Sequence, residues 1–178
     1  QHIQRMKTFN TPDSIMVQKR NITCALNDNG YSRRSIVTAL ADSLLPNSSF
    51  MWGSASGNHI EGTRALLSPP PYYRQIENSL AVVAARGAGI DCLRETEVLC
   101  LGSLLITQDP GWNGDLVHEQ NCLIYESPSE CVDRCHWAIA NPDKAKEIAR
   151  EGNRLYCEQS SPEQQIARLL RKAGLMNE

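Results

Sequence analysis

The stretch Leu80-Ala81-Val82-Val83-Ala84 decides the fold, because it is a short and uninterrupted apolar run. Such a run is expected of a central strand that is buried on both faces of a parallel sheet. We expect residues 91–101 to form a helix and residues 103–107 to form a second buried strand. This order of strand, helix and strand predicts an α/β protein with parallel strands.

The alternation of strands and helices extends outward from this stretch. Ile22, Cys24 and Leu26 alternate with polar or small residues, which is typical of a strand. Apolar residues recur at helical spacing over residues 32–45, which predicts a helix. The other expected elements are a strand over 50–52, a helix over 72–78 and a strand over 122–125. The predicted fold is therefore a Rossmann-like, doubly wound parallel sheet with C-terminal helices.

The last third of the chain is predicted to be helical from its helix starts. Ser127-Pro128-Ser129-Glu130 and Ser161-Pro162-Glu163-Gln164 match capping boxes with proline at the first helical position. Asn141-Pro142 repeats the pattern of a cap followed by proline. The buried stripe of the last helix is predicted to consist of Ile166, Leu169 and Leu170.

These elements suggest a division of the chain into three parts. We expect residues 1–20 to form a leading segment or linker and residues 21–140 to form the Rossmann-like domain. Residues 141–178 are expected to form helices that pack on the same domain. Because the chain begins with Gln1 and not with Met, we expect it to be part of a longer protein.

The composition excludes several classes of protein. The chain has 178 residues, of which 41% are hydrophobic and 21% charged, and this ordinary composition excludes disorder, collagen and coiled coil. A net charge of -2 gives no overall attraction to nucleic acid or anionic lipid. No apolar stretch is long enough to span a bilayer.

The seven cysteines predict buried thiols rather than disulfides or a metal centre. An odd number at irregular spacing is a poor disulfide framework, and free cysteine behaves as a small hydrophobe. Cys131, Cys135 and His136 make a zinc site conceivable, but four ligands at structural spacing are absent. We therefore expect a reducing, cytoplasmic compartment and no bound metal.

Two predicted helices begin with basic residues, although a helix N-terminus carries partial positive charge and prefers acids. Arg33 and Arg34 open the first helix, and Arg94 lies in the first turn of the helix after the 80–84 strand. Both helix starts are expected at the carboxyl ends of parallel strands, where ligands bind. Together they predict a cradle for a phosphate or diphosphate. Taken alone, Arg33 or Arg34 is better explained as a solvated surface charge, but the combination with Arg94 is not.

The segment Arg86-Gly87-Ala88-Gly89 would let backbone N–H groups approach such a ligand. It is not a dinucleotide fingerprint, because Cys92 stands where the third glycine is needed. Glu97 lies one turn after Arg94 on the same helix face. Its carboxylate could accept hydrogen bonds from both hydroxyls of a ribose. A plain salt bridge between Arg94 and Glu97 is an equally good explanation.

The pattern Arg86-Gly87-x-Gly89-x-x-Cys92-x-Arg94-x-x-Glu97, followed by Gly102-Ser103-Leu104-Leu105-Ile106, resembles the donor-site motif of exostosin-like glycosyltransferases. These enzymes share the GT-B architecture of two facing Rossmann-like domains. The segments 72–79 and 114–124 resemble parts of group 1 transferases that flank this motif, and residues 128–175 resemble their C-terminal helices. The resemblance covers residues 20–175 and implies the C-terminal domain, which binds the nucleotide sugar.

The resemblance implies transfer of a sugar from a UDP-, GDP- or dTDP-sugar to a carbohydrate or glycan acceptor. Arg94, with Arg33 or Arg34, would hold the diphosphate, and Glu97 would hold the ribose. The implied substrate-binding residues are Arg33, Arg34, Arg86, Gly87, Gly89, Asp91, Arg94 and Glu97. The catalytic base and the acceptor domain would lie elsewhere in the longer protein, and neither a cofactor nor a metal is implied. Retaining members carry a glutamate where Gly89 stands, so the stereochemistry stays open.

Two alternatives stay open. A non-catalytic module could use the same cleft to sense a nucleotide, or the domain could be flavodoxin-like or NAD-binding. The latter predicts cofactor absorbance, and Gly53-Ser54 offers no ribose-binding acid at the end of the second strand.

Overall fold

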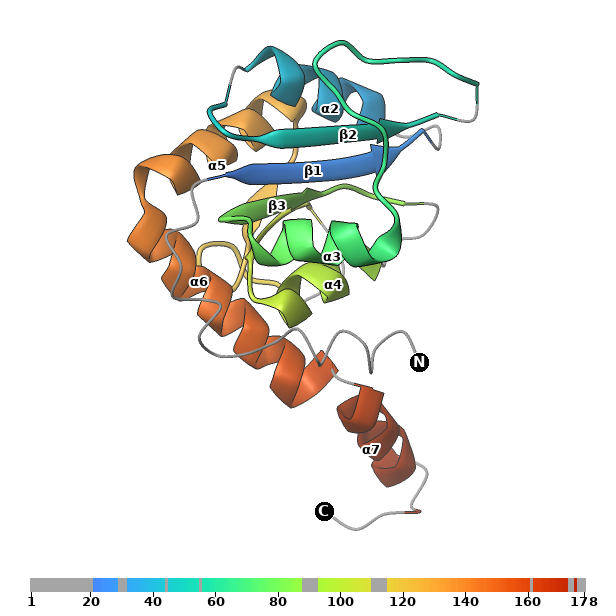
Figure 1. Cartoon of the computed structure of the whole chain (residues 1–178). Helices are drawn as coiled ribbons and strands as arrows, with labels where there is room; N and C mark the ends of the chain where they lie inside the picture. The colour runs from blue at the N-terminus through green and yellow to red at the C-terminus, as the bar shows by residue number, and fades with distance from the viewer. Residues whose placement is uncertain are drawn as a thin grey trace.

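The computed structural model describes residues 21–28, 32–43, 45–54, 56–87, 93–109, 115–160, 162–172 and 175. Within this part of the chain, five parallel strands form one sheet in the order β2-β1-β3-β4-β5 (Figure 1). The strands are β1 (Ile22–Asn27), β2 (Ser49–Gly53), β3 (Ala81–Ala84), β4 (Leu104–Gln108) and β5 (Leu123–Tyr125). This order is one of the common doubly wound arrangements, and the predicted fold class is confirmed.

Helices cover both faces of the sheet (Figure 1). Helices α2 (Arg33–Asp42) and α5 (Pro128–Ala140) lie against one face, and α3 (Pro69–Glu77) and α4 (Leu93–Leu101) against the other. Helix α6 (Pro142–Leu155) contacts β4, α4 and α5. Because both faces are covered, the central strands need apolar side chains on both sides.

Each face of the sheet has its own apolar core. Ala81 and Val83 belong to the core under α2 and α5, whereas Val82 and Ala84 belong to the core under α3 and α4. All four are fully buried. The two-residue period of a strand requires this division, and it explains why the 80–84 stretch has no polar position.

Two helix boundaries differ from the prediction. Helix α3 begins at Pro69, ahead of the predicted start at Tyr72. Proline fits the first helical turn, because N–H groups there have no intrahelical partner. Helix α2 ends at Asp42 and not at residue 45, and the N–H of Ser43 turns back to the carbonyl of Leu40.

The predicted capping box at the start of α5 is confirmed in part, since Ser127 caps the helix but Glu130 accepts from the residue before the cap. Ser127 Oγ accepts a hydrogen bond from the Glu130 N–H at 3.2 Å, and Glu130 Oε2 accepts one from the Glu126 N–H at 2.9 Å. Asn141 does not cap α6 with its side chain. Its Nδ2 donates instead to Trp137 O at 2.9 Å, which satisfies a carbonyl at the end of α5.

The prediction for the last helix is only partly right. Helix α7 (Pro162–Lys172) follows a short π-helical turn, η2 (Tyr156–Ser160), and its predicted cap Ser161 lies outside the described residues. The prediction of a buried stripe is wrong, because its members are exposed: Ile166 57%, Leu169 66% and Leu170 37%. A helical period predicts which residues share a face, but not what covers that face. No described helix is long and apolar enough to cross a membrane.

Six of the seven cysteines lie in the described part of the chain, and each of these is a free thiol. Cys24, Cys131 and Cys135 are fully buried in the core under α2 and α5, together with Tyr125. Burial raises the pKa of the Cys24 thiol well above its usual range. These cysteines therefore pack as small apolar side chains, as the sequence predicts. The prediction is wrong for Cys157, which is exposed.

Candidate functional site

The carboxyl ends of the strands form the edge at which doubly wound sheets bind ligands. Strands β1, β3 and β4 end there at Asn27, Ala84 and Gln108. Because β1 pairs with both β2 and β3, the strand order reverses between β1 and β3, and a crevice is expected at that point. Helices α2 and α4 follow β1 and β3 and therefore begin at this edge.

Arg33, the first residue of α2, ties the end of β1 to the end of β3. It is only 5% exposed, and its Nη1 donates to Asn27 Oδ1 at 2.6 Å. Its Nε donates to Arg86 O at 2.6 Å and its Nη2 to Ala85 O at 3.2 Å. The interpretation of Arg33 as a solvated surface charge is therefore wrong. Whether this guanidinium also contacts a diphosphate stays a prediction.

Arg86 extends this network from β3 to β4. Its backbone N–H donates to Gln108 Oε1 at 3.3 Å, and its Nη2 donates to Asp109 O at 3.2 Å. Gln108 Nε2 in turn donates to Ser32 Oγ at 3.4 Å, directly before α2. Gly87 is half-buried at the same edge. The predicted residues Gly89 and Asp91 lie outside the described residues.

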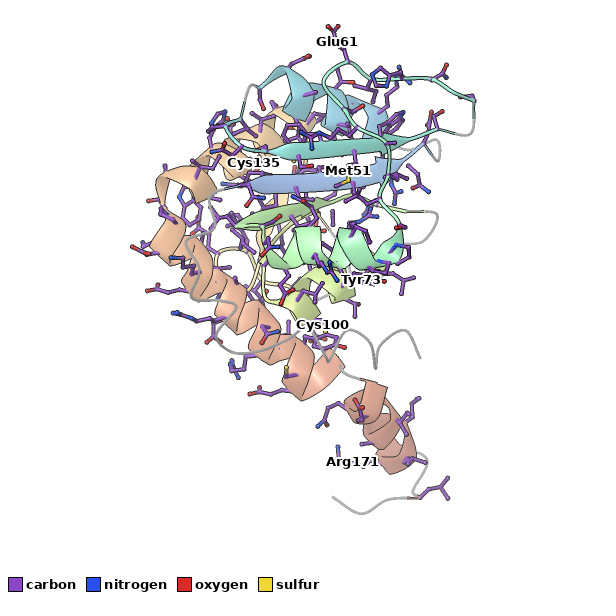
Figure 2. The ribbon with its side chains drawn as sticks, in the orientation of Figure 1. Met51, Glu61, Tyr73, Cys100, Cys135 and Arg171 are labelled. Atoms are coloured by element: carbon purple, nitrogen blue, oxygen red, sulfur yellow. The ribbon has the colours of Figure 1, made fainter. Side chains whose placement is uncertain are left out.

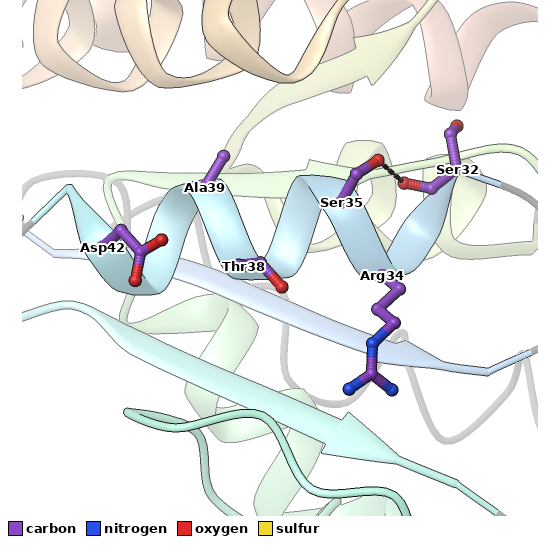
Figure 3. A pocket seen from close by; sticks show the side chains of 6 residues that line it. All are labelled: Ser32, Arg34, Ser35, Thr38, Ala39 and Asp42. Atoms are coloured by element: carbon purple, nitrogen blue, oxygen red, sulfur yellow. Dashed lines mark hydrogen bonds between the residues drawn. The ribbon is translucent and has the colours of Figure 1, made fainter.

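Arg34 lies apart from the other predicted arginines. It is exposed, and its Nη2 donates to His59 O at 3.4 Å. Figure 3 shows the open depression of about 600 Å³ along α2, which is lined by Ser32, Arg34, Ser35, Thr38, Ala39 and Asp42. Arg34 belongs to α2 and Arg94 to α4, which cover opposite faces of the sheet, so a joint role of the two arginines stays a prediction.

Tyr72 of α3 joins Arg94 to Glu97 of α4, and the neighbouring Tyr73 also contacts Glu97. Arg94 Nε donates to the Tyr72 hydroxyl at 2.7 Å, and that hydroxyl donates to Glu97 Oε2 at 3.3 Å. The Tyr73 hydroxyl donates to Glu97 Oε1, also at 3.3 Å. Figure 2 labels Tyr73 where α3 faces α4. The structure thus brings the two residues of the predicted donor motif into one cluster.

Both tyrosines stay protonated at neutral pH. Burial raises the pKa of Tyr72 well above its usual range, Arg94 opposes this rise, and Glu97 adds to it. Burial and the neighbouring carboxylate of Glu97 raise the pKa of Tyr73 to about 12. Each phenol therefore keeps the hydrogen that it donates to Glu97.

Three site residues were missed in the sequence. Glu95 is buried and accepts a hydrogen bond from Thr107 Oγ1 near the end of β4. The signal for this pair was the hydroxyl in an otherwise apolar strand, since a buried hydroxyl needs a partner. Tyr72 and Tyr73 carried no such signal, because their contacts depend on how α3 packs against α4. Among the described residues, no group of three or more histidine, cysteine or acidic side chains is arranged to hold a metal ion.

No protein-family model and no curated protein matches this chain. Several solved structures do share its fold. The C-terminal domain of the group 1 glycosyl transferase LpcC from Francisella tularensis aligns with a TM-score of 0.64 and 12% identity, over 88% of this chain and 98% of that domain. Anabaena HepE in complex with UDP aligns with a TM-score of 0.69 and 13% identity, over 94% of this chain and 55% of HepE.

Sucrose-phosphate synthase from Thermosynechococcus elongatus aligns with a TM-score of 0.66 and 14% identity, over 94% of this chain and 50% of the synthase. The chain thus spans about half the length of these larger proteins and nearly all of the LpcC domain. These similarities show that the chain has the fold of the C-terminal domains of GT-B glycosyltransferases, as the sequence resemblance implied.

Proposed function

We propose that this chain is the donor-binding domain of a glycosyltransferase, which binds a nucleotide sugar and presents the sugar for transfer to a carbohydrate acceptor. One observation carries the proposal: Arg94 and Glu97 cluster on α4, the helix that follows β3, in a fold shared with glycosyltransferase C-terminal domains. HepE, which shares this fold, has been solved with UDP and with UDP-glucose. A UDP-sugar is therefore the first donor to test.

Arg94 and Glu97 offer complementary chemistry for the two polar parts of a nucleotide. A guanidinium matches phosphate oxygens with its planar set of donors, and an ionised carboxylate accepts strong hydrogen bonds from hydroxyl groups. Both residues are half-buried, where charges interact more strongly than in bulk water. Arg94 also lies in the first turn of α4, whose partial positive charge favours a bound anion.

In the proposed transfer, the bond between the anomeric carbon of the sugar and the diphosphate oxygen breaks, and the acceptor hydroxyl oxygen bonds to that carbon. Negative charge grows on the leaving diphosphate, and Arg94 neutralises it without a divalent metal. The acceptor proton passes to a base that we place in an acceptor domain elsewhere in a longer protein. Glu97 holds the ribose and so keeps the sugar in position during the transfer.

A thermal-shift comparison of UDP, GDP and dTDP, each with and without EDTA, tests the proposal. Ligand that binds the folded state stabilises it by about 2.7 kcal/mol at one hundred times its Kd. We expect at least one of these diphosphates to raise the Tm, and we expect EDTA to leave that rise unchanged. Arg94→Ala serves as the control and should abolish the shift.

NAD and FMN belong in the same comparison. A shift with either of them and none with a nucleoside diphosphate would overturn the proposal and favour a flavodoxin-like or NAD-binding domain. A diphosphate shift that disappears in EDTA would contradict the proposed independence from metal.

A further inference from the structure

We propose that Tyr72 is a positioning residue of the nucleotide site: its hydroxyl holds the Arg94 guanidinium and the Glu97 carboxylate in the orientation that receives the nucleotide. The inference rests on the proposed function of these two α4 residues. Tyr72 itself lies on α3, 22 positions before Arg94 in the chain. The donor-site motif therefore does not include it.

The Tyr72 hydroxyl uses both of its hydrogen-bonding capacities in this cluster. It accepts from Arg94 Nε at 2.7 Å and donates to Glu97 Oε2 at 3.3 Å. A phenol has a single O–H donor together with acceptor lone pairs, so one hydroxyl serves a cation and an anion at once. The aromatic ring adds a second contact, because Arg94 Cζ lies 5.6 Å from its centroid, within the range of a cation–π interaction.

These contacts fix the direction of the groups that would meet the nucleotide. The guanidinium is planar, so holding Nε at the Tyr72 hydroxyl restricts the direction of the Nη donors. The cation–π contact of Cζ with the same ring adds to this restriction. The Glu97 carboxylate is held at both oxygens, by Tyr72 at Oε2 and by Tyr73 at Oε1. A carboxylate oxygen can accept more than one hydrogen bond, and this is the capacity that ribose hydroxyls would use.

The donor capacity of Tyr72 persists through the physiological pH range. Burial raises its pKa, and the neighbouring carboxylate of Glu97 adds to the rise. The hydroxyl therefore remains a donor to Glu97 while Glu97 is ionised. A preorganised pair of this kind binds its ligand without first having to order two long side chains.

If Tyr72 had only a structural role, a different result would be expected. Helix α3 packs against α4, and the hydroxyl could serve only to join the two helices. Its removal would then lower the Tm and leave the affinity for nucleotide unchanged. The two roles therefore differ in whether the Kd or the stability responds.

The experiment combines Tyr72→Phe, Glu97→Gln and the double variant, with calorimetric Kd values for UDP and a Tm for each protein. Phenylalanine keeps the ring and its cation–π contact with Arg94, so only the hydroxyl is lost. We expect Tyr72→Phe to weaken UDP binding by about tenfold, the size of one hydrogen bond to a charged group. We expect the loss of UDP affinity in the double variant to be smaller than the sum of the losses in the two single variants. The reason is that Tyr72 acts partly through Glu97, so the two substitutions remove part of the same interaction.

Tyr156→Phe is the matched control. It removes the same hydroxyl from a buried tyrosine that takes no part in the hydrogen bonds of Arg94 and Glu97, and it should leave the Kd for UDP unchanged. Wild-type affinity in Tyr72→Phe, together with weakened binding in Glu97→Gln, would overturn the inference and leave the proposed function standing. The inference would also be overturned if the loss of UDP affinity in the double variant equalled the sum of the two single losses. Absence of UDP binding by the wild-type chain would instead contradict UDP as the donor nucleotide, and the inference would fail with it.

Discussion

Arg33 is the residue on which the carboxyl edge of the sheet depends most. Its guanidinium is buried and donates to Asn27 at the end of β1 and to the carbonyls of Ala85 and Arg86 after β3. A buried acceptor that loses its donor retains the full cost of its desolvation. The edge is therefore held together before any ligand binds.

Arg33→Met should lower the free energy of unfolding by about 1–3 kcal/mol, because the buried carbonyl of Ala85 loses its donor. The part-buried hydrogen bonds to Asn27 and Arg86 are lost as well. Urea unfolding at neutral pH measures the change. Arg34→Met is the matched control, since Arg34 is exposed, and it should stay within about 0.5 kcal/mol of the wild type. Equal stability of the two variants would contradict the assigned role of Arg33.

Tyr125 offers a second test of the same edge. Its hydroxyl is buried and donates to Ala84 O, the last residue of β3, at 2.7 Å. Tyr125→Phe should cost about 1–3 kcal/mol, because the carbonyl is left without this donor. Tyr156→Phe should cost less, because the Cys100 thiol beside its buried hydroxyl is at most a weak hydrogen-bond partner. A larger loss in Tyr156→Phe than in Tyr125→Phe would refute this assignment.

At the scale of elements, helix α6 contains a glycine that tertiary packing requires. Gly152 is buried in α6, and an added Cβ would lie 2.6 Å from Asn121 O and 2.8 Å from Leu99 Cδ2. The backbone oxygen cannot move aside as a flexible side chain could. This glycine therefore lets α6 approach both α4 and the turn before β5.

Gly152→Ala should destabilise the protein by about 1–3 kcal/mol through overpacking. Helix propensity alone predicts the opposite, a gain of about 1 kcal/mol. Thermal unfolding distinguishes the two outcomes by the sign of the Tm change. Glu147→Ala on the exposed surface of α6 is the control and should change the Tm little.

The elements could be predicted where their cause is local. The strand β3 follows from an apolar run, and the start of α5 follows from the Ser127–Glu130 box. The early start of α3 was missed because a run of prolines suggests an interruption, although proline fits the first turn. The exposed stripe of α7 was missed because periodicity does not specify a partner surface.

At the scale of the whole molecule, the predictable part of the site was the part that is close in sequence. Arg94 and Glu97 share one face of one helix, so their spacing alone predicted that they lie together. Arg33 lies 53 positions from Arg86, and Tyr72 lies 22 positions from Arg94. Contacts between residues so far apart in sequence depend on the strand order and on how the helices pack. Neither the composition nor the spacing of residues predicts these features.

The central claim is that the cluster of Arg94 and Glu97 binds the diphosphate and ribose of a nucleotide. If Arg94 and Glu97 formed only an ion pair in this half-buried cluster, substituting Glu97 would change the stability of the fold. If they form a binding site, the substitution would change the affinity for the nucleotide. Removal of an exposed or half-exposed pairing typically costs only about 0.2–1 kcal/mol of stability. Hydrogen bonds between a carboxylate and ribose hydroxyls are roughly twice as strong as neutral ones.

The most direct measurement is therefore a pair of values for Glu97→Gln and the wild type: the Kd for UDP by calorimetry, and the Tm without ligand. We expect the Kd to rise by about tenfold or more, since hydrogen bonds to a charged group weaken, and the Tm to change little. A lowered Tm with an unchanged Kd would contradict the account and assign Glu97 to a structural contact with α3.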